Sequence, residues 1–508
     1  MSFSKVYSAQ TQLLNVTPIS VETDISRGLH AFAVVGLPDK AVEEAKDRVS
    51  AAIKNSGFDS PKSQNHKIVV SLAPADVKKE GTLFDVAIAL SYLAATDALS
   101  INPEGKLFLG ELSLDGRLRP VRGILPVAQY AAKNNFPELF VPVENAAEAA
   151  LITGLKVYAV PTLQALVEHL SGKKLLNPTP ETKGESAIHR AATDFSEVKG
   201  QERAKRGLLI AAAGGHNVAM YGPPGTGKTM LAKAFAGILP KLSFEESLEA
   251  TGIHSVAGTL YETLISTPPF RAPHHTASYV SLVGGGATPR PGEVTLAHRG
   301  VLFMDEFPEF ERRVIESLRQ PLEDKVIAVS RAKGTAHFPA NVLLVAAMNP
   351  CPCGNYGFRG KPCICSPSAL QRYRRKMSGP IMDRIDLWLE VDRIAPHELT
   401  LESPTGEESA IFRERVERAR NIQRLRLKNT KVTKNGEMTP KELVTSVFLE
   451  KDAEKMLNVA AERLGFSPRV YHRMIKVART IADLENSENV KSEHVLEAVE
   501  YRPKKFDI

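Results

Sequence analysis

A glycine-rich segment that ends in lysine and threonine constrains the fold of this chain more than any other feature. Residues 222–229 read Gly-Pro-Pro-Gly-Thr-Gly-Lys-Thr and fit the pattern G-x-x-x-x-G-K-[ST] without a gap. A short apolar run, Asn217–Tyr221, precedes the segment, and Met230–Leu239 has a helical pattern. A strand, a glycine-rich turn and a helix N-terminus in this order point backbone N–H groups at phosphate oxygens. The segment therefore predicts a nucleotide-binding α/β core.

The whole segment is expected to bind the nucleotide phosphates. Its members are Gly222, Pro223, Pro224, Gly225, Thr226, Gly227, Lys228 and Thr229. Lys228 would neutralise charge on the β- and γ-phosphates, and the Thr229 hydroxyl would ligate Mg²⁺. A chance glycine turn before a helix is the alternative interpretation.

Polar residues follow two further apolar runs. Asp305 and Glu306 come after residues 301–304, at the carboxyl end of a predicted strand, where open α/β sheets bind ligands. We expect Asp305 to hold Mg²⁺ through water and Glu306 to polarise the attacking water as general base. Asn349 follows the predicted strand Asn341–Ala347 and is the candidate sensor of the γ-phosphate. An ordinary Asn-Pro turn is the alternative for Asn349.

Two arginines complete the candidate catalytic set. Arg384 lies where a helical pattern gives way to an apolar strand. Arg469 follows Ser467, a suitable N-cap, and Pro468, which suits the first position of a helix. A guanidinium can engage two phosphate oxygens at once. Taken alone, either arginine would be a surface charge, and their order after the other motifs favours the functional interpretation.

The chain is too long for one hydrophobic core, because it has 508 residues. Residues 1–170 mix β-rich runs with helical patterns, and residues 171–194 have a linker's composition. Residues 195–395 alternate short strands with helices, as a doubly wound parallel sheet does, and residues 396–508 have helical patterns. There is no run of about 20 apolar residues and no apolar N-terminal signal, which predicts a cytoplasmic protein without membrane spans.

Positive charge is concentrated in one part of the chain. The net charge is +7, and the 58 residues between Asp324 and Asp383 contain no Asp or Glu. The same stretch carries Lys325, Arg331, Lys333, Arg359, Lys361, Arg372, Arg374, Arg375 and Lys376. A patch of one sign attracts polyanions such as nucleic acid. Solvated loops near a bound nucleotide are the alternative.

All four cysteines lie directly after Asn349, at Cys351, Cys353, Cys363 and Cys365. Four thiolates can close a tetrahedral Zn²⁺ site, although Cys-x-Cys is tighter than the usual spacing. Four reduced thiols in a loop are the alternative. Aromatic and basic residues in the same loop, Tyr356, Phe358, Arg359 and Lys361, suit contacts with single-stranded nucleic acid or simple packing. Lys325–Pro339 reads as a hairpin inserted in the core, with Arg331 and Lys333 near its tip.

Several long motifs resemble one known family. Arg290–Glu306, RPGEVTLAHRGVLFMDE, is similar to the motor subunit of magnesium chelatase. HHTASYVSLVGGG, LLVAAMNPCPCG, SGPIMDRIDLWLEV and KVARTIADLE resemble the bacterial YifB/ComM family of competence-associated, Mg-chelatase-like AAA+ ATPases. The N-terminal GLHAFAVVGLPDKAVEEAKDRVSAAIKNSGF does so too. The resemblance extends over essentially the whole chain.

This resemblance implies a ring, expected to be a hexamer, with ATP sites between subunits. Arg384 then resembles an arginine finger that reaches a neighbour's site, and Arg469 a sensor that acts on its own subunit's nucleotide. The resemblance also implies a DNA helicase that drives branch migration in recombination or natural transformation. The expected fold is α/β and multidomain, with an AAA+ P-loop core and a C-terminal helical lid.

The N-terminal region resembles the Lon protease domain, which belongs to the ribosomal S5 domain 2-like fold. LFLGELSLDGRLRPVRGILP carries that likeness. Lon-type proteolysis needs a serine and a lysine, but Lys79–Asp85 contains no serine and Ile124–Val127 no lysine. We therefore expect a non-proteolytic module. One alternative to a DNA motor is a chelatase-like ATPase that remodels a protein partner. Another is an ATP-dependent protease, which the missing serine and lysine oppose.

Overall fold

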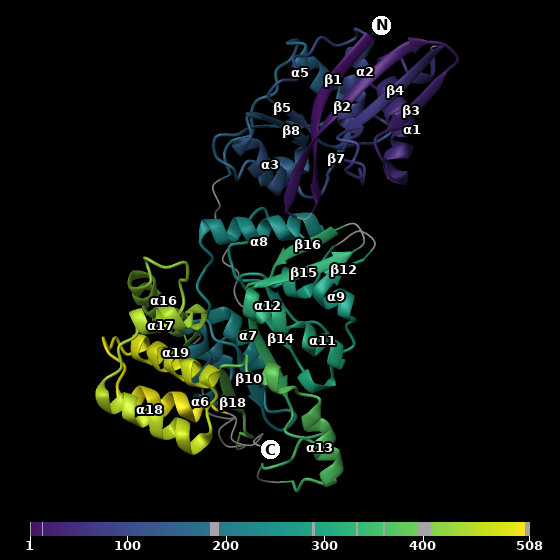
Figure 1. Ribbon diagram of the computed structural model, residues 1–508. Coiled ribbons are helices and arrows are strands. Elements are labelled where there is room, and N and C mark those ends of the chain that lie inside the picture. Colours follow the sequence, from purple (N-terminus) through teal and green to yellow (C-terminus); the bar gives the residue numbers. More distant parts are fainter. Residues whose placement is uncertain are drawn as a thin grey trace. The chain divides into compact units, whose positions relative to one another are not determined.

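The chain folds into two compact units, shown as a ribbon in Figure 1. The structure is a computed structural model that describes residues 2–12, 14–63, 65–182, 193–286, 290–331, 334–358, 361–394 and 408–502. One unit comprises Met1–Ser186 with Ser247–Ile265, and the other comprises Ala187–Glu246 with Ser266–Ile508. The expected mixed α/β, multidomain class is confirmed. Ser247–Ile265 interrupts the predicted nucleotide-binding core in sequence but belongs to the first unit.

The first unit contains two principal sheets. The four-stranded sheet has the order β1-β2-β4-β3, with β1 Ser2–Gln12, β2 Asn15–Arg27, β4 His66–Ala73 and β3 Ala31–Val35. The parallel three-stranded sheet joins β5 Lys106–Phe108, β8 Glu138–Pro142 and β9 Lys156–Val160. Two short strands, β6 Glu111–Leu112 and β7 Leu118–Arg119, form a hairpin. The helices are α1 Lys40–Asn55, α2 Asp85–Ala95, α3 Ile124–Lys133, α4 Val143–Ala149 and α5 Leu163–Leu170.

Helix α2 forms the centre of this unit because it is apolar on nearly every side and buried along its length. It packs against β1 and β2 on one side and against α1 on the other. The first residues of α3, Ile124 and Leu125, are fully buried and lie near the place where a Lon-like domain is expected to carry its lysine. The Lon-like assignment itself stays a prediction. Of the expected linker, Thr182 still hydrogen-bonds to Ala147 of this unit at 2.8 Å, whereas residues 183–192 lie outside the described part of the chain.

The second unit is built on a five-stranded parallel sheet with the order β11-β14-β17-β10-β18. The strands are β11 Phe270–Arg271, β14 Val301–Met304, β17 Leu343–Met348, β10 Val218–Tyr221 and β18 Leu387–Glu390. All residues of β10 and β14 are buried, because helices such as α6 Glu202–Gly214 and α7 Lys228–Ile238 pack against the sheet. Parallel strands place their carboxyl ends at one edge, which brings the loops after β10, β14 and β17 together.

Two antiparallel hairpins project from this core. The first pairs β12 Gly284–Gly285 with β13 Arg290–Pro291, and residues 287–289 between them are not described. The second pairs β15 Val326–Arg331 with β16 Gly334–Pro339, as the sequence predicted for Lys325–Pro339. Lys333, expected near the tip of this hairpin, lies outside the described residues. The short helices of this region are α9 Tyr279–Val283, α10 Glu293–Leu296, α11 Arg312–Ser317, α12 Arg319–Asp324, α13 Pro367–Arg375 and α14 Gly379–Met382.

The described residues 408–502 form helices, as expected. They are α16 Glu408–Arg426, α17 Pro440–Ser446, α18 Lys451–Leu464, α19 Pro468–Leu484 and α20 Ser492–Glu500, with a 3₁₀ turn at Asn435–Glu437. Helix α19 begins as its sequence predicts, because the Ser467 side chain accepts a hydrogen bond from Val470 N at 3.3 Å and Pro468 takes the first helical position. Helices α16 and α19 pack on α6. In the part of the chain that the structure describes, no helix is long and apolar enough to cross a membrane.

Candidate functional site

The predicted phosphate-binding segment forms the loop between β10 and α7. Gly222 packs so closely on the chain that a Cβ there would lie 1.9 Å from the Val391 carbonyl oxygen, which only glycine allows. Gly227, the residue before α7, has a φ of +87°, a conformation that favours glycine. The loop therefore leads directly into a helix N-terminus, where backbone N–H groups and the helix dipole favour an anion.

Lys228 lies in the centre of this loop and is 8% exposed. Its ammonium group donates to the Gly222 and Pro223 carbonyl oxygens at 2.9 and 2.8 Å and to Asn349 Oδ1 at 3.3 Å. Burial lowers the pKa of Lys228 to about 8, against the opposing attraction of Asp305. A phosphate in the loop would offset this loss of solvation, because it supplies negative charge next to the ammonium group.

The predicted magnesium ligands are adjacent. Thr229 Oγ1 donates to Asp305 Oδ2 at 2.8 Å, which joins the first turn of α7 to the carboxyl end of β14. Hydroxyl and carboxylate oxygens are hard ligands of the kind Mg²⁺ prefers. Thr229 and Asp305 would therefore be able to hold Mg²⁺, which would offset phosphate charge.

Glu306 has an unusual backbone and a partner that the sequence did not predict. Its φ is +51°, and its N–H donates to Asp305 Oδ1 at 2.9 Å. Its carboxylate lies 3.1 Å from Nδ1 of His275, in the segment that follows β11. The sequence offered one weak signal, a His-His pair in HHTASYVSLVGGG, but nothing in its spacing connected His275 with Glu306.

Asn349 follows β17, whose carboxyl end lies next to the phosphate-binding loop. Its side-chain oxygen contacts Lys228, and its carbonyl oxygen accepts a hydrogen bond from Tyr373 of α13 at 2.9 Å. Burial raises the pKa of Tyr373, which keeps its hydroxyl a donor. The structure therefore brings together Lys228, Thr229, Asp305 and Asn349, with Glu306 next to Asp305 in sequence.

Arg384 and Arg469 lie together, but both contact a carboxylate of the protein and not the phosphate-binding loop. Arg384 and Arg469 each donate to a different oxygen of the Glu323 carboxylate in α12. Arg384 also donates to the Arg319 and Pro380 carbonyl oxygens, at 3.1 and 2.6 Å. In this conformation both guanidinium groups are bound to α12 rather than to the phosphate-binding loop. The cis role expected for Arg469 stays a prediction.

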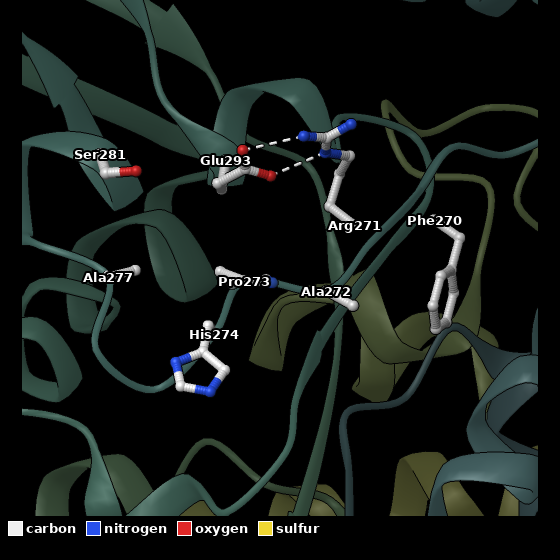
Figure 2. A pocket seen from close by; sticks show the side chains of 8 residues that line it. All are labelled: Phe270, Arg271, Ala272, Pro273, His274, Ala277, Ser281 and Glu293. Carbon is white, nitrogen blue, oxygen red and sulfur yellow. Dashed lines mark hydrogen bonds and ion pairs between the residues drawn. The ribbon is translucent and has the colours of Figure 1, made fainter.

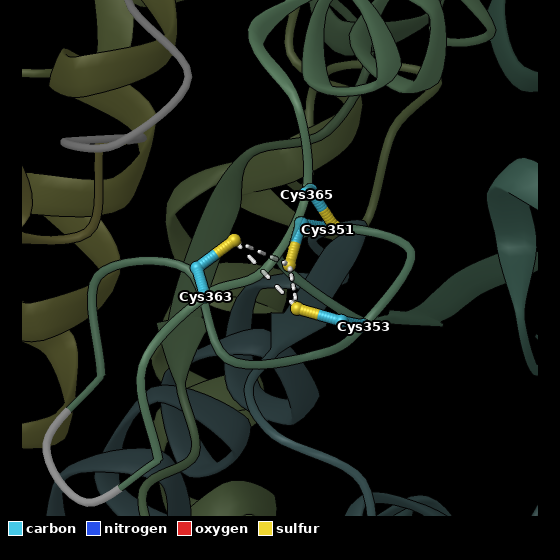
Figure 3. Close-up of side chains that lie close together, drawn as sticks. All are labelled: Cys351, Cys353, Cys363 and Cys365. Atoms are coloured by element: carbon cyan, nitrogen blue, oxygen red, sulfur yellow. Dashed lines mark hydrogen bonds between the residues drawn. The ribbon is translucent and has the colours of Figure 1, made fainter.

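The four cysteines form one cluster, seen in Figure 3. Their sulfur atoms all lie within 4.8 Å of one another, and Cys351 Sγ is 3.4 Å from Cys353 Sγ and 3.8 Å from Cys363 Sγ. A tetrahedral zinc with Zn–S bonds of about 2.3 Å separates its sulfur ligands by about 3.8 Å, so the cluster fits this ion. The Tyr356 backbone N–H donates to Cys351 Sγ at 3.3 Å.

The cysteine loop also contacts the phosphate-binding loop. A Cβ on Gly354 would lie 2.5 Å from Pro224 Cδ, so the two loops pack closely. Any change in the order of the cysteine loop is thus expected to reach the nucleotide site.

Part of the predicted basic stretch is neutralised by acids outside it. Lys325 is ion-paired with Glu437, and Lys376 Nζ lies 2.7 Å from Glu309. Arg374 lies over the Tyr356 ring at 5.2 Å, whereas Arg372 and Arg375 on α13 are exposed. Arg359 lies outside the described residues. The exposed positive charge is therefore centred on α13, next to the cysteine loop.

A separate hollow of about 400 Å³ is lined by residues of the segment that begins at β11, and by Glu293 (Figure 2). Arg271 and Glu293 line it and contact each other in a bidentate ion pair, at 2.7 and 2.8 Å, and His274 also lines it. None of the lining residues belongs to the phosphate-binding loop. This hollow is therefore distinct from the predicted nucleotide site.

Comparison with protein families agrees with these features. Residues 194–399 match the family model described as magnesium chelatase, subunit ChlI. Residues 21–145 match the model of subunit ChlI of Mg-chelatase, and residues 406–502 match the model of the C-terminal part of that subunit.

Individual relatives are similar along the whole chain. Competence protein ComM of Haemophilus influenzae is 42% identical over 99% of this chain and 98% of its own length. The YifB protein of Escherichia coli is 43% identical over 99% of this chain and 97% of its own. The magnesium-chelatase 38 kDa subunit of Rhodobacter capsulatus is 27% identical over 32% of this chain and 51% of its own.

Proposed function

This chain belongs to the ComM/YifB family of magnesium-chelatase-like proteins, and on that basis we propose that it is a ring-forming AAA+ ATPase that moves on DNA. The observation that carries the ATPase assignment is the convergence of Lys228, Thr229, Asp305 and Asn349 where three parallel strands end. These side chains offer a cation, two magnesium ligands and a polar sensor around one loop. That set is what phosphoryl transfer to water requires.

Each residue has a distinct role in the proposed reaction. Lys228 and the backbone N–H groups of the loop bind the β- and γ-phosphates, while Thr229 and Asp305 would hold Mg²⁺, which would offset phosphate charge. Glu306 accepts the proton of the attacking water as general base. Asn349 orients that water or the γ-phosphate from the end of β17.

His275 is proposed to orient Glu306, because its Nδ1 lies 3.1 Å from the carboxylate that must face the water. Replacing His275 with alanine is expected to lower kcat about tenfold and leave the Kd for ATP unchanged, since orientation rather than binding is lost. Steady-state ATPase kinetics and nucleotide titration measure both quantities. The exposed His30→Ala, in the first unit, serves as control. An unchanged kcat in His275→Ala would remove this role.

We propose further that copies of the chain assemble into a ring, expected to be a hexamer, and that Arg384 completes the neighbour's site. Arg384→Ala is then expected to retain ATP binding and to lose about 10³-fold in turnover, as loss of an arginine finger does. Its control is Arg418→Ala, an exposed arginine of α16. Turnover and nucleotide binding are measured for both variants.

Mixing experiments test whether Arg384 acts across subunits. Lys228→Ala subunits keep Arg384, and Arg384→Ala subunits keep a sound phosphate-binding loop. Mixed rings should therefore recover part of the activity at composite sites. No recovery in rings verified to be mixed would show that Arg384 does not act in trans.

Zinc binding by the cysteine cluster is part of the proposal, supported by the sulfur–sulfur distances. Protein purified without chelator is expected to contain about one zinc per chain. Replacing Cys363 and Cys365 with serine should remove the zinc and loosen the loop. ATP hydrolysis should fall only partly, through the Gly354–Pro224 contact, and DNA binding should fall further.

Elemental analysis and thiol titration check this prediction. The control is Ile364→Ala, because Ile364 lies between the two cysteines and is 85% exposed. Less than about a tenth of an equivalent of zinc, with four freely titratable thiols, would show that the loop holds four reduced cysteines and no zinc site.

We propose that the motor moves on DNA. Two observations support this proposal: the acid-free stretch with its exposed arginines on α13, and the similarity to a relative named competence protein. A helicase that drives branch migration in recombination or natural transformation fits both. Branched or single-stranded DNA would contact the basic surface through its phosphates.

The test is ATPase turnover without DNA and with single-stranded, duplex or forked DNA. Stimulation by forked DNA alone favours branch migration. Turnover that no DNA changes would favour the chelatase-like alternative, in which the ATPase remodels a protein partner.

A further inference from the structure

Glu323 of α12 has no role in the proposed reaction, yet it contacts two of the candidate catalytic arginines. Its carboxylate is the point where Arg384 and Arg469 meet, with one guanidinium group on each oxygen. Both arginines were candidates for contact with a nucleotide phosphate. Glu323 thus supplies them with an internal anion in place of a phosphate.

The pair of arginines is held together independently of Glu323. Arg473, one turn after Arg469 on α19, lies 2.7 Å from Asp386, which is two residues after Arg384. Asp386 is itself fixed, because its carboxylate accepts a hydrogen bond from Asn217 N at 3.0 Å. Loss of the Glu323 contacts would therefore leave Arg384 and Arg469 side by side and able to bind another anion.

The Glu323 contacts are suited to being exchanged. The Glu323 side chain is 48% exposed, that of Arg469 is 43% exposed and that of Arg384 is 10% exposed. The Glu323–Arg469 pair is therefore open to water, and such ion pairs add little stability. Guanidinium–phosphate contacts are charge-assisted and often bidentate, so a phosphate can displace a single carboxylate.

Glu323 also lies at the base of the β15–β16 hairpin. Helix α12 ends at Asp324, and the next residue, Lys325, accepts a hydrogen bond from Ala340 N at 2.8 Å, which closes the hairpin. Lys325 is ion-paired with Glu437, and Asn341 Nδ2 donates to the same carboxylate at 3.3 Å. A movement of α12 therefore reaches the first residues of the hairpin directly.

We propose that Glu323 is a positioning residue that couples the nucleotide state to the hairpin. It holds Arg384 and Arg469 until both transfer to the phosphate of a nucleotide on a neighbouring copy. In this proposal Arg469 therefore acts in trans with Arg384 and not on its own subunit's nucleotide. Their departure releases α12 and with it the hairpin strands β15 and β16. This inference rests on the proposed function, because it takes Arg384 to act on a neighbour's nucleotide.

Hydrogen–deuterium exchange on the full-length protein tests the coupling without DNA. In the wild type, a non-hydrolysable ATP analogue should raise exchange in Val326–Pro339 at least about twofold. In Glu323→Gln, exchange there should already be high without nucleotide and should not rise further. Glu316→Gln is the control, because Glu316 pairs with Arg319 at 3.2 Å and contacts neither Arg384 nor Arg469 through an ion pair.

Turnover provides the second measurement. Glu323→Gln should raise DNA-free turnover about two- to fivefold, since the arginines no longer exchange with a competing carboxylate. A wild-type hairpin that does not respond to nucleotide, or a Glu323→Gln hairpin that responds like the wild type, would overturn the coupling. Failure of DNA to stimulate wild-type turnover would instead count against the DNA motor, and it would leave the exchange result standing.

Discussion

Replacing Lys228 with alanine is expected to abolish tight ATP binding. Lys228 is buried in the phosphate-binding loop, and its ammonium group donates hydrogen bonds there to two carbonyl oxygens and one amide oxygen. Each charged hydrogen bond to a phosphate contributes about 1.5–3 kcal/mol, so loss of two such contacts should raise the Kd for ATP about 100-fold or more. Titration with a fluorescent ATP analogue measures this change.

Lys233→Ala is the matched control, because Lys233 is an exposed lysine of the same helix, α7. Its Kd for ATP should equal that of the wild type. ATP-dependent thermal stabilisation should likewise disappear only in Lys228→Ala, since a ligand stabilises the state it binds. Wild-type affinity in Lys228→Ala would place the nucleotide elsewhere, for instance in the hollow beside Arg271.

Glu306→Gln should have the opposite profile, with ATP bound and not hydrolysed. Glutamine keeps the size and polarity of the side chain but cannot accept a proton from water. General-base catalysis typically contributes about 10²–10⁴-fold, so kcat should fall by that factor while the Kd for ATP stays within about twofold. Single-turnover hydrolysis and nucleotide titration on the same preparation provide both values.

Glu309→Gln controls for loss of a nearby carboxylate. Glu309 is three residues further on and pairs with Lys376 at 2.7 Å. Its turnover without DNA should match the wild type. If Glu306→Gln turned over ATP normally, another residue would have to be the base, and the role of His275 would fall with it.

The parts of the site that sequence could predict are those governed by local rules. The phosphate-binding loop needs glycines at fixed positions, and Gly222 and Gly227 have the close approach and the positive φ that the pattern requires. The hairpin Lys325–Pro339 and the start of α19 at Pro468 also follow from local signals. The parallel sheet then accounts for the proximity of Asp305 and Asn349, because both follow strands that end at the same edge.

The remaining features depend on contacts between distant segments. His275 reaches Glu306 only because β11 and β14 are neighbours in the sheet, and the intervening sequence gives no sign of that pairing. The meeting of Arg384 and Arg469 on Glu323 joins three separate helices or loops. Ser247–Ile265 has no composition that separates it from the surrounding core, yet it belongs to the first unit.

The central claim is that ATP hydrolysis at this site drives movement on DNA. The direct measurement is ATP-dependent branch migration of a fluorescently labelled DNA junction, followed in real time with wild-type protein and with Glu306→Gln. We expect the wild type to separate the labelled strands only with hydrolysable ATP. Glu306→Gln should bind the junction in the presence of ATP and separate nothing. Wild-type protein that hydrolyses ATP at equal rates with and without the junction, and leaves its strands paired, would contradict the account.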